Sequence, residues 1–314
     1  RWNWGLVAGQ VPYLTGGYEQ LGTVIRGEPV IVEQSIRYWQ ISREISGVLS
    51  LPLNRAQRLE FSTGYQNVSF DAQAEVNIYS ANTGVLLASQ IADVPTDPAM
   101  HMSISRAALV YDTSIFGGTS PVVGQSYRLE AGATAGSLNY FTLLADWRRY
   151  VRPVRPFTLA GRVMHFGRYG GDAESQRLQD LFVGYPSLVR GYEADSFSIQ
   201  ECGPALMVNG ACPAFDRLLG SRIAVANAEL RIPLLGFLGV IPSRSLPPVE
   251  SALFYDAGMA WTSAGVAKSL NRPRKPVSSY GVSLRFNVLG YFIGQLSYVH
   301  ANDRPLKPWM WEFS

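Results

Sequence analysis

The sequence predicts an all-β protein, specifically an antiparallel transmembrane β-barrel. Charged residues make up only 16% of the 314 residues, against about 25% in a typical soluble domain. Aromatic residues reach 12%, and 30 glycines and 19 prolines indicate frequent turns. The third observation is a strict alternation of apolar and polar residues in segments of about ten, the length of a tilted strand that crosses a bilayer.

The alternation is clearest in residues 280–288, where every even-numbered residue is apolar or aromatic. Residues 71–79 also carry their apolar residues mainly at even positions, whereas 125–136 and 141–148 carry theirs mainly at odd positions. Several of these apolar faces carry an aromatic ring at a strand end, such as Phe141 and Trp147, which suits the interfacial girdles of a membrane barrel. The opposite faces keep charged residues, as a water-facing lumen requires, whereas a soluble β-sandwich would turn its charged face outward.

We predict about 14 strands in a single domain over residues 1–314, because no linker or low-complexity tract divides the chain. The segment 35–47, SIRYWQISREISG, lacks a clear turn and fits either one long strand or a helical turn. The long connections are 80–100, 113–124, 167–220 and 232–249. The predicted strands lie near 2–11, 29–40, 42–53, 57–67, 70–79, 101–112, 125–136, 138–150, 156–166, 221–231, 251–261, 279–289, 291–301 and 308–314.

Several classes of protein are disfavoured by composition and spacing. The 27 basic residues are interleaved with 24 acidic ones, which gives no basic patch for nucleic acid. The longest apolar run, Ile232 to Ile241, is too short for a helix that crosses a membrane, which needs about 20 residues. No secretory signal opens the chain. No catalytic triad, paired-carboxylate set or phosphate-binding loop is evident, so we expect no enzyme activity and no cofactor. His101, His165 and His300 are scattered, so we expect no metal site.

Cys202 and Cys212 lie ten residues apart in the segment ECGPALMVNGAC. Because no histidine is nearby, a metal site is disfavoured, and we predict a loop disulfide formed in an oxidising compartment. Two unpaired thiols are the alternative.

The motif Val189, Arg190, Gly191 and Tyr192 lies within the long connection 167–220. A connection of that length indicates function or disorder. We predict that it folds back into the barrel and that Arg190 holds it there. The alternative is that Arg190 only fixes the loop and stabilises the barrel, with no part in moving a substrate.

Strand alternation identifies the partners of this arginine. In residues 222–231 the alanines at even positions face lipid, so Asn227, Glu229 and Arg231 face the lumen. The same parity turns Asp256 inward in residues 251–261 and Arg285 inward in residues 280–288. We predict that Glu229 and Asp256 accept the guanidinium fork. Asn227, Arg231 and Arg285 are predicted to be further polar residues of the lumen.

Four segments in this order, 189–192, 222–231, 251–261 and 280–288, resemble the barrel of the bacterial surface antigen family. That family includes outer-membrane protein-assembly barrels and two-partner-secretion transporters. The family's Val-Arg-Gly-Tyr/Phe motif, in its sixth outer loop, matches residues 189–192. Its acidic partners match Glu229 in AELRIP and Asp256 in FYDAG. Family barrels have 16 strands with five after the loop, and we count five after residue 192. Nine predicted strands precede the loop, two fewer than the eleven of the family. The first two strands and any periplasmic modules are therefore expected upstream. The ending WMWEFS lacks the usual internal glycine, so the last strand is expected to be truncated.

The resemblance implies a barrel in the outer membrane of Gram-negative bacteria that inserts or translocates unfolded polypeptides. Its partners would be outer-membrane lipids, the polypeptide substrate and accessory lipoproteins. The alternative is an anchor or export barrel for a passenger domain upstream, such as a propeller or a hydrolase. The third possibility is a soluble β-sandwich or carbohydrate-binding domain. Whether the protein needs detergent to stay in solution would distinguish it from a membrane barrel.

Overall fold

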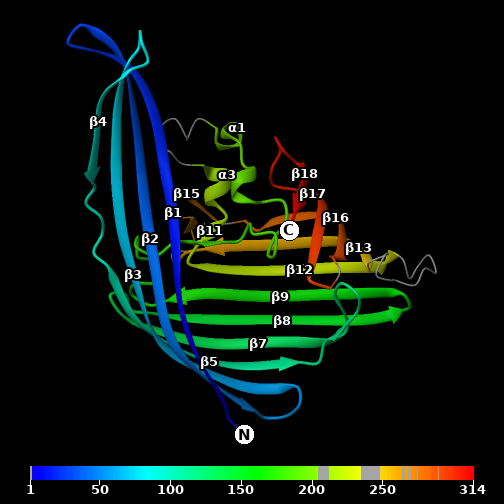
Figure 1. Cartoon of the computed structure of the whole chain (residues 1–314). Coiled ribbons are helices and arrows are strands. Elements are labelled where there is room, and N and C mark those ends of the chain that lie inside the picture. Colours follow the sequence, from blue (N-terminus) through cyan, green and yellow to red (C-terminus); the bar gives the residue numbers. More distant parts are fainter. Residues whose placement is uncertain are drawn as a thin grey trace.

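The computed structural model of the protein is nearly all β (Figure 1). It describes residues 2–203, 212–234, 248–263, 266–267, 270–273, 275–288 and 290–314. One 14-stranded antiparallel sheet dominates, and its main order is β1-β2-β3-β5-β7-β8-β9-β12-β13-β16-β17-β18. The prediction of an all-β barrel fold is confirmed.

The main order follows the sequence, so each strand pairs with the next main strand along the chain. Two further strands lie off this path: β4 (Leu86–Asp93) pairs with β3, and β6 (Ile115–Phe116) pairs with β7. The main strands are β1 (Asn3–Ile25), β2 (Glu28–Pro52), β3 (Gln57–Ser80), β5 (Met100–Asp112), β7 (Pro121–Gly136), β8 (Tyr140–Val154), β9 (Phe157–Tyr169), β12 (Arg222–Pro233), β13 (Val249–Trp261), β16 (Val277–Val288), β17 (Phe292–Ala301) and β18 (Trp309–Phe313).

The smaller elements lie in the connections. Two short antiparallel pairs join β10 (Leu181–Phe182) to β11 (Leu219–Gly220) and β14 (Val266–Ala267) to β15 (Leu270–Pro273). Among the described residues, the helices are η1 (Ala194–Ser196), α1 (Ile199–Cys202) and α3 (Pro213–Asp216). None of the helices in that part of the chain is long and apolar enough to cross a membrane.

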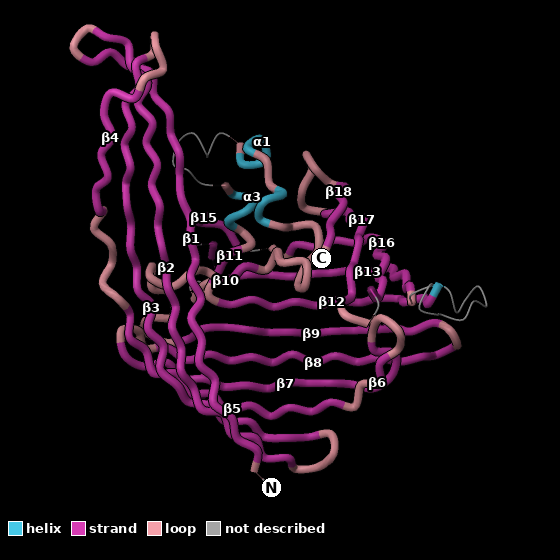
Figure 2. The backbone as a smooth tube through the Cα atoms, in the orientation of Figure 1, coloured by secondary structure: helices cyan, strands magenta, loops and turns pink. Residues whose placement is uncertain are grey.

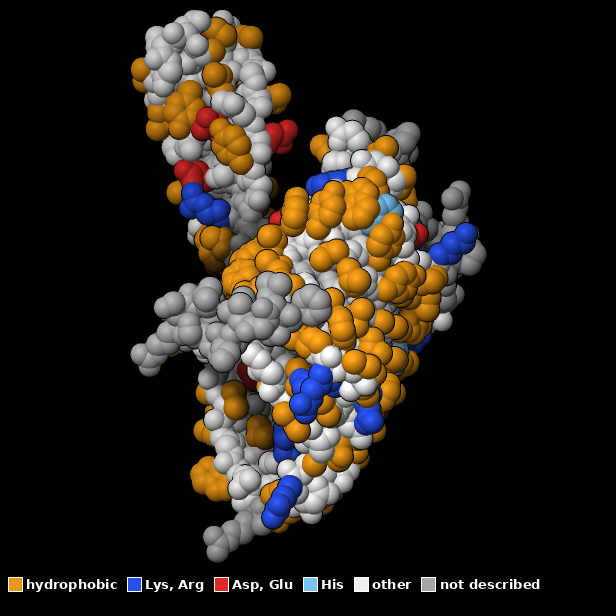
Figure 3. Space-filling model, turned by 90° about the vertical axis from the view of Figure 1, so that its right-hand side faces the viewer, with side chains coloured by type: hydrophobic (Ala, Val, Ile, Leu, Met, Phe, Trp, Pro, Cys, Tyr) orange, Lys and Arg blue, Asp and Glu red, His pale blue; other side chains and the backbone are white. Residues whose placement is uncertain are grey.

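The sheet curls around an interior, and the loop between β9 and β12 lies on its inner side (Figures 1 and 2). On β13, exposed Leu253 and Tyr255 alternate with buried Phe254 and Asp256. Apolar side chains gather on the outer surface (Figure 3). Because period-2 alternation sends alternate residues to opposite faces, this sheet presents an apolar wall outward and a polar lumen inward.

Aromatic rings cluster on the outer surface where strands end. The ring of Tyr280 lies 4.8 Å from that of His300, and Tyr298 lies 4.8 Å from Trp309 and 4.7 Å from Trp311, centroid to centroid. Such rings suit the boundary between lipid and water, where one edge is apolar and the other is wet.

The first part of the chain differs from the strand pattern that the sequence predicted. Residues 29–40 and 42–53 form the single strand β2, and 57–67 and 70–79 form the single strand β3. The β2–β3 ladder runs without a break from Val30–Ser80 to Pro52–Arg58. Seven main strands therefore precede the loop, where nine were predicted, while five follow it as predicted. The predicted connection 80–100 contains β4, and 232–249 lies largely outside the described residues.

These strand boundaries were predicted wrongly because each strand was expected to end at the edge of the bilayer, after about ten residues. β3 pairs with β5 only through Gln57–Val68 and with β4 through Gln73–Tyr79. Beyond β5, the upper parts of β1, β2 and β3 therefore continue with β4 as a projecting ribbon (Figure 1).

The two faces of the sheet exchange their polarity in this ribbon. Within the barrel, the outer face carries apolar residues that are paired across β1, β2 and β3, such as Trp4–Leu49–Phe61. The same face in the ribbon carries Arg37–Gln73–Asp93 and Glu33–Asn77–Ser89. The opposite, lumen-side face becomes apolar there, with rows such as Val32–Ile78–Ala88. This change is expected where strands leave the hydrocarbon layer and their outer face meets water.

Candidate functional site: the lumen around Arg190

The loop between β9 and β12, residues 170–221, is here called the re-entrant loop. Its two ends are tied together by the β10–β11 pair, and Cys202 and Cys212 are joined by a disulfide with an S–S distance of 2.06 Å. The loop side chains Val183, Val189, Tyr192 and Leu218 are at most 1% exposed and belong to the main hydrophobic core. The loop is therefore packed against the inner wall of the sheet.

The guanidinium of Arg190 is buried and engaged on all sides. Its Nε and Nη2 lie 2.6 and 2.8 Å from the two carboxylate oxygens of Asp256. Nη2 also lies 2.9 Å from Oε1 of Glu229, and Nη1 donates to Oγ of Ser283 at 3.2 Å. The guanidinium carbon lies 3.5 Å from the centroid of the Phe254 ring. Because Asp256 is 0% and Arg190 4% exposed, each charge depends on the other to offset the loss of its hydration.

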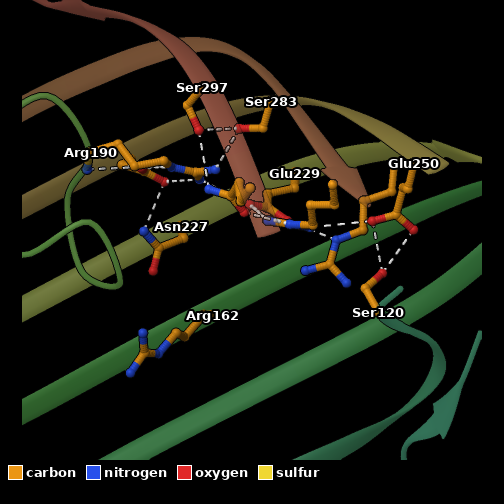
Figure 4. A network of polar contacts seen from close by, with 12 residues as sticks. Ser120, Arg162, Arg190, Asn227, Glu229, Glu250, Ser283 and Ser297 are labelled. Carbon is orange, nitrogen blue, oxygen red and sulfur yellow. Dashed lines mark hydrogen bonds and ion pairs between the residues drawn. The ribbon is translucent and has the colours of Figure 1, made fainter. Parts of the chain in front are cut away.

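Glu229 joins this pair to a second layer of charges (Figure 4). Its oxygens accept from Nη1 and Nη2 of Arg285 at 2.9 and 2.7 Å, and from Nε of Arg231 at 2.7 Å. Glu250 lies 3.4 Å from Nη1 of Arg285 and accepts from the hydroxyl of Ser120. The cluster therefore balances three guanidinium groups against three carboxylates: Arg190, Arg231, Arg285, Glu229, Glu250 and Asp256.

Backbone groups next to the motif are also bound by the wall. Nδ2 of Asn227 donates to the carbonyl of Leu188 and to Oδ1 of Asp256, both at 2.8 Å. Nη1 of Arg162, on β9, donates to the carbonyl of Ser187 at 2.8 Å. The wall thus fixes the chain that leads into the motif as well as its arginine.

The other motif residues fit the wall by shape. A Cβ added to Gly258 would lie 2.5 Å from Cγ2 of Val189, so the glycine of FYDAG leaves room for the valine. The hydroxyl of Tyr192 donates to the carbonyl of Ser278 at 2.8 Å. Burial raises the pKa of the Tyr192 phenol, and the nearby carboxylate of Asp303 adds to that rise. Tyr192 therefore stays a neutral hydrogen-bond donor.

The structure brings the sequence-predicted site residues together. Glu229 and Asp256 both contact Arg190, while Asn227 reaches Asp256. Arg231 and Arg285 lie one contact further away, on Glu229.

Sequence reasoning missed several residues of the site. Ser283 and Phe254 could have been found, because they share the inward parity of Arg285 and Asp256. Glu312 also has inward parity on β18, but neither its contact with the backbone of Gly191 nor that of Arg304 could have been found. Arg304 lies in a turn, and contacts to backbone atoms leave no spacing pattern in the sequence.

The apolar outer wall, the polar lumen and the loop packed inside it define an outer-membrane β-barrel whose own loop occupies its interior. The Omp85 superfamily domain matches residues 32–288, and the chain belongs to this superfamily. The resemblance to the bacterial surface antigen family is thereby confirmed.

Among 72 matching chains of known structure is the crystal structure of BamA from Haemophilus ducreyi lacking POTRA domains 1–3. The TM-score is 0.59 at 14% sequence identity, and the match covers 97% of this chain and 61% of that one. The likeness is therefore one of fold, and the chain spans 61% of the length of that BamA chain. No curated protein matches the chain.

Proposed function

We propose that the protein is a barrel for the insertion or translocation of unfolded polypeptides, and that the re-entrant loop is an internal latch held by Arg190. The observation that carries the proposal is the buried ion-pair cluster, in which a loop arginine is bound by carboxylates from β12 and β13. In this proposal the protein is no enzyme and needs no cofactor. Its partners are outer-membrane lipids and the polypeptide.

The cluster suits a latch because its charges are balanced only when the loop is in place. Withdrawal of Arg190 leaves Asp256 and Glu229 in the lumen with one cation fewer. Removing one partner of a buried ion pair costs about 3–5 kcal/mol. The closed arrangement is thus favoured until a substrate, or water that enters with it, replaces the arginine.

A cysteine pair offers a direct test of whether the loop must move. Because a Cβ at Gly258 would lie within 2.5 Å of Cγ2 of Val189, Val189→Cys with Gly258→Cys places two sulfurs within bonding reach. The double variant would be reconstituted in liposomes and given an unfolded outer-membrane protein. Protease protection of that substrate would be compared in oxidised and reduced samples. Val189→Cys alone and the wild type with and without reductant are the controls, since reductant also opens Cys202–Cys212.

Translocation through the lumen predicts that the oxidised lock stops protection and that reduction restores it. Insertion at an edge of the sheet predicts that activity survives the lock. A barrel that only anchors a passenger domain predicts no protection above that of empty liposomes in any sample, and this result would refute the proposed function.

A further inference from the structure

The backbone of Gly191 is bound on both sides by the C-terminal hairpin, which consists of β17, β18 and the turn at 302–308. Its N–H donates to Oε2 of Glu312 on β18 at 2.7 Å. Its carbonyl accepts from Nη1 of Arg304 in the turn at 3.0 Å. These contacts are separate from the ion pairs of Arg190, whose carboxylate partners lie on β12 and β13.

Arg304 binds the loop at more than one place. It is 1% exposed, and its Nε and Nη2 each lie 2.8 Å from an oxygen of Glu201 in α1. Nη1 donates to the hydroxyl of Ser196 at 2.7 Å, and the guanidinium lies 3.9 Å from the centroid of the Phe197 ring. One buried arginine of the hairpin therefore holds the tip of the loop and the helical segment that follows it.

Gly191 also packs directly on the hairpin. Its φ is +86°, and an added Cβ would lie 2.8 Å from Cγ1 of Val299 and 3.4 Å from Cβ of Ala301. Both β17 residues are at most 1% exposed. The hairpin thus occupies the space that a side chain at position 191 would need, which explains the glycine of the motif.

Glu312 is placed at a cost. Its Oε2 accepts from Gly191, but within the described part of the chain its Oε1 is buried without a hydrogen-bond partner. A buried oxygen left unpaired opposes folding. The carboxylate is therefore poorly explained by the stability of β18 alone, and its one strong contact is with the loop.

We infer that Arg304 and Glu312 form a second clamp on the latch, through which the position of the re-entrant loop is coupled to that of β18. β18 stands at one end of the sheet order, where it pairs with β17. A displacement of β18 moves Glu312 away from Gly191, and release of the loop removes a contact that holds β18. Such coupling is reciprocal: displacement of β18 favours release of the loop by the same free energy by which release of the loop favours displacement of β18. The inference rests on the proposed function, in which this loop is the latch.

The first arm of the test measures loop release with a thiol reporter. Both native cysteines are in the disulfide, so Val189→Cys provides one thiol, which is buried while the loop is closed. In the full chain in liposomes, Arg304→Ala and Glu312→Ala should each raise the maleimide labelling rate roughly tenfold or more, as expected for the loss of a charged hydrogen bond. Glu312→Gln keeps an acceptor oxygen and should label at nearly the wild-type rate. Arg128→Ala, which removes a lumen arginine paired with Glu60 and Glu130, should change nothing.

The second arm reads the coupling in the other direction. Asp256→Asn weakens the wall side of the latch without touching the hairpin, so amide hydrogen exchange in residues 309–313 should accelerate, while exchange in β8 should not. If Val189→Cys prevents folding, as judged by heat-modifiable gel mobility, exchange in residues 188–193 replaces the labelling.

Faster exchange at 309–313 in Asp256→Asn supports the clamp. Unchanged exchange there, in protein whose loop is released, overturns it and leaves Glu312 as a local contact. The transport assay on the same liposomes is read separately. Absence of transport in the wild type would refute the proposed function, while the exchange data still decide whether the loop and β18 are coupled.

Discussion

Arg190 and Asp256 are joined by a two-pronged ion pair that also reaches the backbone. Nε and Nη2 of the arginine lie 2.6 and 2.8 Å from the two carboxylate oxygens. The backbone N–H of the same arginine lies 3.3 Å from Oδ2. One carboxylate of β13 thus fixes both the side chain and the chain direction of the loop tip. This relationship underlies the predictions that follow.

Gly191→Ala should release the loop for two reasons. The new methyl group clashes with β17, and the positive φ of this residue is unfavourable for alanine. Gly27→Ala is a matched control, because Gly27 has a φ of +87° with nothing within 4 Å of an added Cβ. Backbone strain alone costs about 1 kcal/mol, so Gly27→Ala should lower stability slightly and leave loop protection unchanged. Protease sensitivity of residues 184–200 measures the difference. Equal sensitivity in both variants would mean that β17 does not support the loop.

Glu229→Gln should destabilise the barrel more than Glu250→Gln. Glu229 is contacted by Arg190, Arg231 and Arg285, whereas Glu250 meets Arg285 only at 3.4 Å. Loss of the Glu229 charge leaves three buried guanidinium groups with one carboxylate fewer, at an expected cost of about 3 kcal/mol or more. Urea unfolding in lipid, followed by heat-modifiable mobility, compares the two variants. The idea of Glu229 as the hub of the cluster fails if Glu250→Gln has the larger effect.

Loop closure should weaken in acid through Glu201. Hydrogen bonds from Arg304 hold the pKa of the Glu201 carboxyl below its ordinary value of 4.5, although partial burial opposes them. A carboxyl whose pKa is lowered on folding contributes stability above its unfolded pKa, and this contribution is lost as the pH falls through the folded pKa. Protection of residues 188–193 against amide hydrogen exchange, corrected for the intrinsic pH dependence of exchange, should therefore fall below about pH 4.5 in the wild type. A Glu201→Gln background should lose most of that acid dependence. An identical acid response in both would assign it to other groups.

The sequence carries enough information to place the wall of the site but not the whole loop. Alternation with period 2 leaves no freedom once one residue of a strand is assigned to lipid, so Glu229, Asp256 and Arg285 could be turned inward correctly. The assumption that a strand ends with the bilayer gave wrong boundaries in β2 and β3. Strands that leave the bilayer continue their ladder, and only the polarity of their faces changes.

The contacts of the C-terminal hairpin lie beyond such reasoning. Arg304 comes from a turn, where no periodicity exists, and it binds a carbonyl, which every residue possesses. Glu312 is on the inward face of β18, but a single inward carboxylate does not indicate which loop atom it accepts from. Such contacts depend on three-dimensional packing.

The coupling between Arg190 and Asp256 tests the central claim most directly. Arg190→Ala and Asp256→Asn, alone and together, would be unfolded by urea in lipid, with Arg128→Ala as a control outside the site. We expect each single change to cost about 3–5 kcal/mol, and the double variant to cost less than their sum by about 2 kcal/mol. Strictly additive costs would show that the two side chains do not act as a pair and would contradict the latch.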